Sequence, residues 1–231
     1  MIQLHRISPL DPADAFPDVS SALDQPPGLL AAGGDLSTER LLAAYRRGIF
    51  PWYEAGQPIL WWSPDPRAIM RPSEFHVSRS LRRTLNRGHY ETSIDGDFAG
   101  VINSCAAARP GQQGTWITGE MEQAYSRLHE LGWAHSVETW HSGALVGGVY
   151  GVAIGRVFFA ESMFSRSSDA SKVALVRLTT DLQRWNFELI DCQMSSPHLA
   201  SLGMREIPRS DFVAQLERLC SAKPQDGAWT E

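Results

Sequence analysis

The most regular pattern of apolar and polar positions lies in the second half of the chain. Three runs with the alternation of half-buried strands follow one another there, over residues 134–141, 144–153 and 156–162. They are joined by Ser142-Gly143 and Ile154-Gly155, which suit tight turns between antiparallel neighbours. The pattern therefore predicts a three-stranded antiparallel meander, and a further strand is predicted over residues 187–193.

Apolar residues recur every three or four positions in four other stretches, as they do on one face of an α-helix. These predicted helices cover residues 37–48, 119–131, 168–185 and 210–219. Ser37 and Thr118 can cap the first two, and Gly48 and Gly132 can end them. Two shorter helical segments are predicted over residues 78–87 and 196–202.

The order of these elements predicts an α+β protein with helices packed on a mainly antiparallel sheet. Residues 1–35 are rich in proline and glycine, which favours an irregular segment over regular elements. The stretch around Trp62–Pro66 indicates a domain boundary, so we predict a small N-terminal domain over residues 1–63 and a larger domain over residues 64–231. N-acyltransferase folds have a compatible order of elements, but several other folds share it.

Composition and charge restrict the function only broadly. The chain has 231 residues and a formal net charge of −5, so a contact with nucleic acid must come from a local patch. Its three cysteines form no CxxC pair, which suits a reducing compartment. The first ten residues lack signal-peptide features, and the longest uncharged run, residues 143–155, is shorter than the roughly 20 residues of a spanning helix. We therefore predict a cytoplasmic protein without a membrane partner.

The predicted strand 187–193 ends with two polar residues where apolar ones are expected. Because side chains alternate along a strand, Asp191 and Gln193 are predicted to share a face. Asp191 either reaches solvent or caps the next helix, or it orients Gln193 so that the amide contacts a reacting amine or carbonyl. Cys192, on the opposite face, suits a small core residue.

Glu161 is the other isolated carboxylate, since it stands among aromatic and apolar residues in 158-FFAESMFS-165. An ionised carboxylate in such surroundings is costly unless a cation or a hydrogen-bond donor meets it. Glu161 therefore either faces water from an edge strand or recognises a cationic group of a ligand.

Two tryptophans stand in loops. Trp52 follows Pro51, and Trp116 lies between a glycine-rich stretch and a helix cap. Most tryptophans in folded proteins are core or interface residues. Loop tryptophans beside glycines can also sandwich a nucleobase, with stacking of about 1–3 kcal/mol per base.

Four arginines fall in the predicted helix 78–87, namely Arg79, Arg82, Arg83 and Arg87. Three of them are spaced four apart, which places them on one helical face. A solvated surface is the ordinary explanation of such a row. In an acidic chain, a contact with a phosphate backbone is the alternative.

Motifs for several other chemistries are missing from the sequence. It contains no GxGxxG, Walker loop, HExxH or GxSxG, and its seven histidines have no metal-ligand spacing. The pyrophosphate loop of acetyl-CoA-dependent acyltransferases is replaced by 165-SRSSDASK-172. No cofactor and no metal are therefore predicted.

Long sequence motifs resemble those of one family, and they occur in the same order as in that family over nearly the whole chain. They include YRRGIFPWY (45–53), ILWWSPDPRAI (59–69), GTWIT (114–118), LVGGVYGVAIG (145–155), ESMFS (161–165), LIDCQ (189–193) and HLASLGMREIPR (198–209). On these words the chain resembles the bacterial leucyl/phenylalanyl-tRNA–protein transferase family.

The resemblance implies a small N-terminal domain followed by an N-acetyltransferase-like (GNAT) domain. It also implies an aminoacyltransferase that moves leucine or phenylalanine, with methionine as a further candidate, from aminoacyl-tRNA to the α-amine of an N-terminal arginine or lysine. The modified protein would enter the N-degron pathway of degradation. Aminoacyl-tRNA and the acceptor protein or peptide would be the partners, with no cofactor, metal or membrane.

The family's site residues carry over by position. Trp52 and Trp116 would bind the 3′-terminal adenosine. Asp191 and Gln193 would assist the acceptor amine, and Glu161 would hold the cationic end of the acceptor or order the catalytic centre. The aminoacyl side chain would enter an apolar pocket with the positional candidates Val149, Phe158, Leu175, Leu178 and Ile190. The four arginines would contact the tRNA body.

The chain departs from the family words in and beside the supposed pocket. Ala160 replaces the usual glycine before Glu161, Val149 stands where methionine is frequent, and Leu178 stands where an aromatic residue can occur. Donor preference therefore stays open. An acyl-CoA-dependent N-acyltransferase fits the order of elements but not the missing pyrophosphate loop. A non-catalytic RNA-binding protein fits the arginines and tryptophans but gives the isolated polar strand residues no role.

Overall fold

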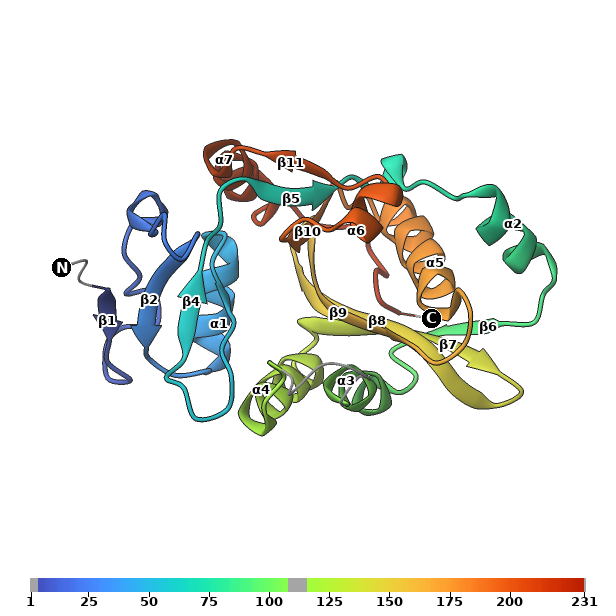
Figure 1. Cartoon of the computed structure of the whole chain (residues 1–231), viewed down its shortest axis with the longest axis horizontal. Coiled ribbons are helices and arrows are strands. Elements are labelled where there is room, and N and C mark those ends of the chain that lie inside the picture. The colour runs from blue at the N-terminus through green and yellow to red at the C-terminus, as the bar shows by residue number, and fades with distance from the viewer. Residues whose placement is uncertain (1–3, 108–115, 231) are drawn as a thin grey trace.

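Two β-sheets organise the computed structural model, which describes residues 4–107 and 116–230 (Figure 1). The first sheet has four strands in the order β1-β2-β4-β3. These are β1 (His5–Ile7), β2 (Leu29–Gly33), β3 (Phe50–Pro51) and β4 (Leu60–Trp62). Helix α1 (Thr38–Arg46) connects β2 to β3, and the predicted cap Ser37 accepts a hydrogen bond from the Arg40 N–H.

The prediction that residues 1–35 are irregular is wrong, because they contain β1, β2 and the short 3-10 helix η1 (Val19–Ser21). One of the glycines marks a close approach of two strands. Gly33 of β2 pairs with Ile7 of β1 and has a φ of +97°, and a Cβ atom at Gly33 would lie 2.4 Å from the Ile7 carbonyl oxygen. Gly33 therefore permits the pairing of β1 with β2, which the proline- and glycine-rich composition of this segment does not indicate.

The second sheet has seven strands in the order β11-β5-β10-β9-β8-β7-β6. In chain order they are β5 (Arg67–Met70), β6 (Glu91–Ile94), β7 (Ala134–His141), β8 (Ala144–Ile154), β9 (Val157–Ser165), β10 (Leu189–Gln193) and β11 (Arg205–Ile207). The predicted meander is confirmed, because β7, β8 and β9 pair antiparallel in succession. In the described part of this sheet only β9 and β10 are parallel, so the α+β class with a mainly antiparallel sheet is confirmed.

The parallel strands β9 and β10 separate partway along their length. Their pairing covers Val157–Phe159 and Leu189–Asp191, while β9 continues to Ser165. The pairing of β10 with β5 is also irregular between Asp191 and Gln193. The sheet therefore opens between β9 and β10 just beyond Phe159 and Asp191.

Helices cover both faces of the seven-stranded sheet (Figure 1). On one face, α5 (Ala170–Arg184) packs along β7 and β8, with α2 (Arg79–Asn86) beside it. On the other face lie α3 (Phe98–Ala106) and α4 (Gly119–Glu130). The remaining helical elements are η2 (Pro72–Glu74), α6 (Pro197–Ser201) and α7 (Arg209–Leu219). All six predicted helical segments are confirmed, whereas α3 was not predicted.

A hydrophobic cluster lies on each face of this sheet. The α5-side cluster contains, among others, Val149, Phe158, Leu175, Leu178 and Ile190. The α4-side cluster contains residues of both sheets, namely Trp61 of β4, Tyr150 of β8 and Phe159 of β9. It also contains the helix residues Tyr45, Tyr125 and Phe212. The predicted domain boundary falls between β4 of one sheet and β5 of the other, and it stays a prediction. Within residues 4–107 and 116–230, no helix is long and apolar enough to cross a membrane.

Candidate active site

Glu161 lies on β9 where this strand has left β10. A register shift between β8 and β9 pairs Tyr150 with Ser162 and Gly151 with Ala160, so Glu161 sits at a bulge. Tyr45 of α1 donates a hydrogen bond to its Oε1 at 2.7 Å, and Tyr125 of α4 donates to its Oε2 at 2.9 Å. The two tyrosine hydroxyls also contact each other. Glu161 is therefore held by donors from two helices and does not stand free in water.

The surroundings of Glu161 bring the pKa of its carboxyl group close to neutral pH. Burial raises its pKa to about 7, against the lowering effect of hydrogen bonds from Tyr45 and Tyr125. The negative charge of Asp191 raises the pKa further, and the positive charge of Arg67 lowers it. Burial raises the pKa of both tyrosines well above the usual value, so they stay donors. A carboxyl group with a pKa near neutrality can both take up and release a proton at physiological pH.

Asp191 is fully buried and paired with Arg67, the first residue of β5. The Arg67 Nε donates to Asp191 Oδ1 at 2.8 Å, and Arg67 Nη2 donates to Oδ2 at 2.7 Å. Both side chains are completely excluded from solvent. Both carboxylate oxygens therefore have a fixed cationic partner, and the predicted readings of solvent exposure or helix capping do not describe Asp191.

Arg67 reaches further partners with the rest of its guanidinium. Its Nη1 donates to the Gly48 carbonyl oxygen at 3.1 Å, directly after α1. The guanidinium carbon lies 5.0 Å from the ring centroid of Phe50 and 4.6 Å from that of Phe212. Arg67 thus connects the small sheet, α7 and β10. No local sequence pattern indicates this role, because its partner Asp191 is 124 positions away.

Gln193 meets Asp191 through its main chain and not through its amide. Its backbone N–H donates to Asp191 Oδ1 at 3.0 Å, and its φ is +55°. The pairing of β10 with β5 shifts between these two residues, with Asp191 opposite Ile69 and Gln193 opposite the next residue, Ala68. The regular alternation on which the predicted shared face rests is therefore interrupted. The Gln193 amide instead lies 3.5 Å from Glu161 Oε1, so Asp191 fixes a bulge that aims this amide at Glu161.

Tyr150 of β8 adds a third tyrosine to this region. Its ring lies edge-on to those of Tyr125 and Phe98, with centroids 5.7 and 5.8 Å apart. Its hydroxyl is buried and has no hydrogen-bond partner among the described residues. Burial and then the charge of Glu161 raise the Tyr150 pKa well above its usual value, so the hydroxyl keeps its proton.

The two loop tryptophans differ in exposure. Trp52 is 38% exposed and lies edge-on to Trp62, with ring centroids 5.5 Å apart, while Trp62 donates its indole N–H to the Trp52 carbonyl at 2.7 Å. Trp116 is half-buried and packs against the α4-side cluster. The residues 114 and 115 of its sequence word lie outside the described residues. Trp52 thus offers an accessible ring, while Trp116 is tied to the core.

The five predicted pocket residues are brought together. Val149, Phe158, Leu175, Leu178 and Ile190 are all buried in the α5-side cluster. Cys192 packs against the same cluster, and burial raises the pKa of its thiol, as suits a core residue. The cluster begins beside the opening between β9 and β10, since Phe158 and Ile190 are paired there.

The arginine row lies on α2, which Figure 1 shows beyond α5 at one end of the large sheet. Arg79, Arg82, Arg83 and Arg87 are all exposed, and none of them forms an ion pair within the described residues. The helix is anchored by buried Leu81 and by a hydrogen bond from Thr84 to Asp169 at 3.1 Å, directly before α5. The row therefore keeps its positive charges free for an external partner.

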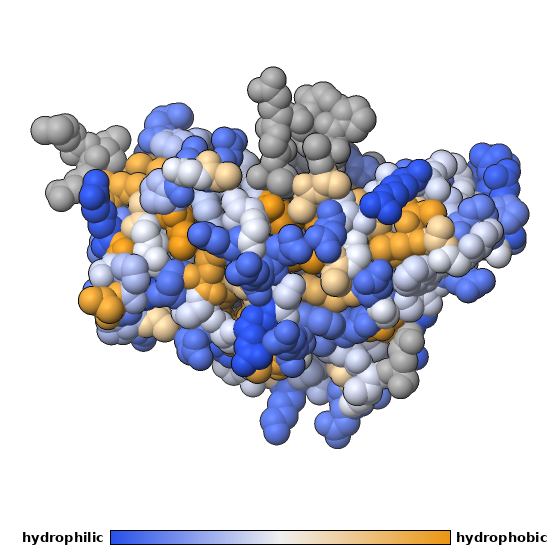
Figure 2. Space-filling view, turned by 90° about the horizontal axis from the view of Figure 1, so that it is seen from below, coloured by the Kyte–Doolittle hydropathy of each residue, from blue (hydrophilic) through white to orange (hydrophobic). Residues whose placement is uncertain are grey.

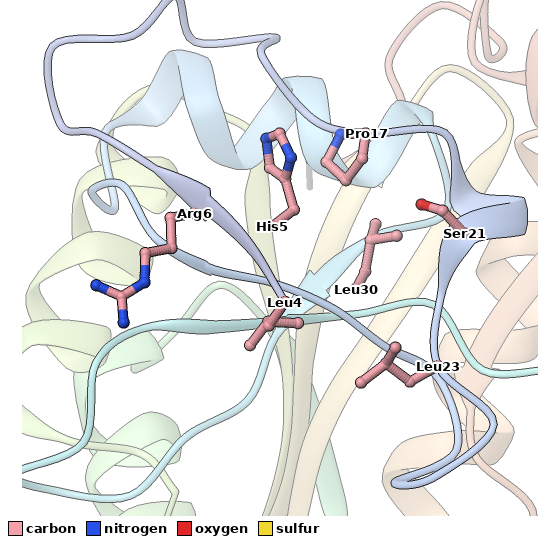
Figure 3. Close-up of a pocket in the computed structure, with 7 residues that line it drawn as sticks. All are labelled: Leu4, His5, Arg6, Pro17, Ser21, Leu23 and Leu30. Atoms are coloured by element: carbon pink, nitrogen blue, oxygen red, sulfur yellow. The ribbon is translucent and has the colours of Figure 1, made fainter. Parts of the chain in front are cut away.

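Other surface features do not join this site. On the face in Figure 2, apolar residues are scattered between hydrophilic ones. A hollow on the small sheet is lined by Leu4, His5, Arg6, Pro17, Ser21, Leu23 and Leu30 (Figure 3). It shares no residue with the group around Glu161. Within the described residues, no three histidine, cysteine or acidic side chains are arranged to hold a metal ion.

Two family profiles match the chain in succession. Residues 34–65 match the leucyl/phenylalanyl-tRNA protein transferase N-terminal domain, and residues 69–217 match the leucyl/phenylalanyl-tRNA protein transferase family. Three curated relatives named leucyl/phenylalanyl-tRNA–protein transferase are similar over nearly their whole length. That of Thiobacillus denitrificans is 57% identical over 96% of this chain and 97% of its own. That of Nitrosospira multiformis is 58% identical (93% and 92%), and that of Aromatoleum aromaticum is 60% identical (93% and 91%).

Likeness to solved structures is much weaker. A GCN5-related N-acetyltransferase from Kribbella flavida aligns with a TM-score of 0.36 and 11% identity, over 71% of this chain and 59% of its own. The L-PGS structure from Bacillus licheniformis aligns with a TM-score of 0.39 and 11% identity, over 70% of this chain and 52% of its own. Similarities at this level carry no argument about chemistry.

Proposed function

The chain belongs to the leucyl/phenylalanyl-tRNA–protein transferase family, and we propose that it transfers leucine or phenylalanine to the α-amine of an N-terminal arginine or lysine. It is an aminoacyltransferase whose donor is aminoacyl-tRNA. In this proposal the reaction takes place in the cytoplasm, and the added residue marks the acceptor protein for the N-degron pathway.

One observation carries the chemical part of the proposal, namely the arrangement around Glu161. This carboxyl group lies at the opening between β9 and β10, with two tyrosine hydroxyls and the Gln193 amide around it. Burial raises its pKa to about 7. The acceptor α-amine has an ordinary pKa of about 7.7–8 and must lose a proton before it can attack an ester. A carboxylate whose pKa lies close to that of the amine suits this transfer.

In the proposed reaction the ammonium group loses two protons. The first passes to Glu161 and from there to solvent. The neutral nitrogen then bonds to the ester carbonyl carbon, the bond from that carbon to the ribose oxygen breaks, and the second proton goes to the departing ribose oxygen. The ester is already an activated acyl donor, so these steps need no covalent enzyme intermediate.

Asp191 has a positioning role in this scheme. Its two oxygens are occupied by Arg67, and one of them also accepts the Gln193 N–H. Fixed donors therefore occupy both carboxylate oxygens of Asp191, and neither oxygen is directed at a substrate amine. Asp191 therefore holds the bulge at Gln193, and the Gln193 amide orients the amine beside Glu161.

The donor occupies the sites that the family resemblance indicates. Trp52 and Trp116 hold the terminal adenosine, for which the partly exposed Trp52 ring offers a stacking surface. The aminoacyl side chain enters the α5-side cluster beside Val149, Phe158, Leu175, Leu178 and Ile190, all of which are apolar and buried. The unpaired arginines of α2 contact tRNA phosphates.

The test is a transfer assay with radiolabelled Leu-tRNA or Phe-tRNA and three peptides that differ only in an N-terminal arginine, lysine or alanine. The proposal expects labelled product with the first two peptides and little with the third. Equal labelling of all three would contradict the acceptor assignment. Turnover of acetyl-CoA without tRNA, or tight tRNA binding without transfer, would favour the rival functions instead.

A further inference from the structure

The segment that follows α7 returns across the large sheet and enters the α5-side cluster. The Gln225 N–H donates to the Trp185 carbonyl at 3.0 Å, at the end of α5. Arg156, in the turn between β8 and β9, donates its Nε–H to the Lys223 carbonyl at 2.8 Å. Ala228 and Trp229 then pack against the cluster. This segment lies outside the regions 34–65 and 69–217 that match the family profiles.

Trp229 lies at the centre of an aromatic group. It stacks on His135, with ring centroids 4.1 Å apart and an interplanar angle of 7°, and on Phe158 at 5.6 Å and 29°. Trp185 and Phe187 contact it at 4.9 and 5.9 Å. One indole therefore joins β7, β9 and the end of α5 within this cluster.

The structure keeps Trp229 in place despite two local costs. Its φ is +65°, a left-handed backbone conformation that residues other than glycine rarely adopt. Its indole N–H is buried and has no acceptor among the described residues. The packing of the ring must outweigh both costs, so the position of the ring is well determined by its neighbours.

Phe158 is the residue through which Trp229 can act on the reaction. It is 1% exposed, pairs with Ile190 across the parallel strands, and belongs to the five residues assigned to the aminoacyl pocket. Its ring has Trp229 on one side, so it cannot move in that direction while the indole is present. The depth available to a donor side chain then depends on a residue far along the chain.

We propose that Trp229 is a positioning residue that sets the depth of the aminoacyl pocket by holding the Phe158 ring, and this inference rests on the proposed function. Without the indole, Phe158 can tilt into the vacated space and the pocket deepens. A deeper apolar pocket favours phenylalanine over leucine, because the phenylalanine side chain is larger by about three carbon atoms and pockets discriminate even one methylene group.

The test compares kcat/KM for Phe-tRNA and Leu-tRNA, with one peptide that begins with arginine. Trp229→Ala should raise the Phe/Leu ratio roughly tenfold over that of the unmodified protein. Trp229→Phe retains a ring and should keep the ratio near that of the unmodified protein. Trp133→Ala is the matched control, since Trp133 is also half-buried but packs against the α4-side cluster beneath Arg46.

A purely structural role for Trp229 predicts a different pattern. Trp229→Ala would then lower both kcat/KM values in proportion to the loss of folded protein and leave their ratio unchanged, which would overturn the inference. If Trp229→Ala does not fold, Trp229→Leu should shift the ratio in the same direction by a smaller factor, and an unchanged ratio would again overturn it. Failure of the unmodified protein to transfer either amino acid would instead overturn the proposed function and this inference with it.

Discussion

Arg67 and Asp191 form a doubly hydrogen-bonded ion pair between neighbouring strands, with both side chains fully buried. A buried pair of this kind is strongly destabilised when one partner is removed, because the other charge is left uncompensated. The same pair holds the Gln193 N–H, and through it the amide next to Glu161. Stability and catalysis therefore depend on one contact, and they can be separated by mutation.

Replacing either Arg67 or Asp191 alone should reduce the stability of the fold, whatever its effect on transfer. Arg67→Met and Asp191→Leu should each lower the free energy of unfolding by about 3–5 kcal/mol, measured by urea denaturation. The double variant should recover much of this loss, since an apolar pair of similar size carries no buried charge. It should still transfer poorly, because nothing then holds the Gln193 bulge. Near-normal turnover by the folded double variant would contradict the positioning role of Asp191.

The tyrosines around Glu161 should control the pH at which transfer begins. Hydrogen bonds from Tyr45 and Tyr125 lower the Glu161 pKa, against the larger raising effect of burial that brings it to about 7. Transfer needs the ionised carboxylate, so the rate should rise with pH through about 7. Tyr45→Phe or Tyr125→Phe removes a donor to the ionised form, and the rising limb should move to higher pH.

The control for the tyrosine variants is Tyr90→Phe, which removes a hydroxyl bonded to the Ser168 carbonyl and not to Glu161. Its pH–rate profile should match that of the unmodified protein. The acceptor peptide is the same in every assay, so titration of its amine contributes equally to all profiles. Coinciding profiles for all variants would show that Glu161 does not govern this limb.

The arginines of α2 should affect donor binding without affecting the chemistry. Replacing Arg79, Arg83 and Arg87 by alanine should weaken tRNA binding and reduce its dependence on salt, because each phosphate contact releases counterions. A minimal aminoacyl-adenosine donor lacks these phosphates and should react nearly as before. An equal loss with both donors would refute a contact between this helix and the tRNA body.

The sequence indicated the strands of the active site but not the groups that complete it. Asp191, Gln193 and Glu161 stand out locally as polar residues in apolar strands. Their partners come from distant positions: Arg67 is 124 residues from Asp191, and Tyr45 is 116 residues from Glu161. Tyr45 and Tyr125 also occupy apolar positions of helices, so their spacing indicates core packing. It does not indicate that their hydroxyl groups are hydrogen-bond donors in the site.

Short strands and irregular backbone account for other differences. The strands β1, β5, β6 and β11 have three or four residues each, too few for an alternating pattern to be recognised. The shared face expected for Asp191 and Gln193 follows from ideal alternation, which the irregularity between these two residues interrupts. The position of Trp229 in the α5-side cluster likewise depends on tertiary contacts, which no local sequence pattern predicts.

The central claim is that Glu161 takes the proton that the acceptor amine must lose. The measurement is the single-turnover rate of Glu161→Gln relative to the unmodified protein, with saturating Leu-tRNA and an arginine peptide, from pH 6.5 to 9 (~2.5 pH units around the amine pKa). The deficit should be about 10²–10⁴-fold near pH 7 and should narrow toward pH 9, where the amine is already neutral in solution. A deficit that stays constant over this range, or no deficit at all, would contradict the claim.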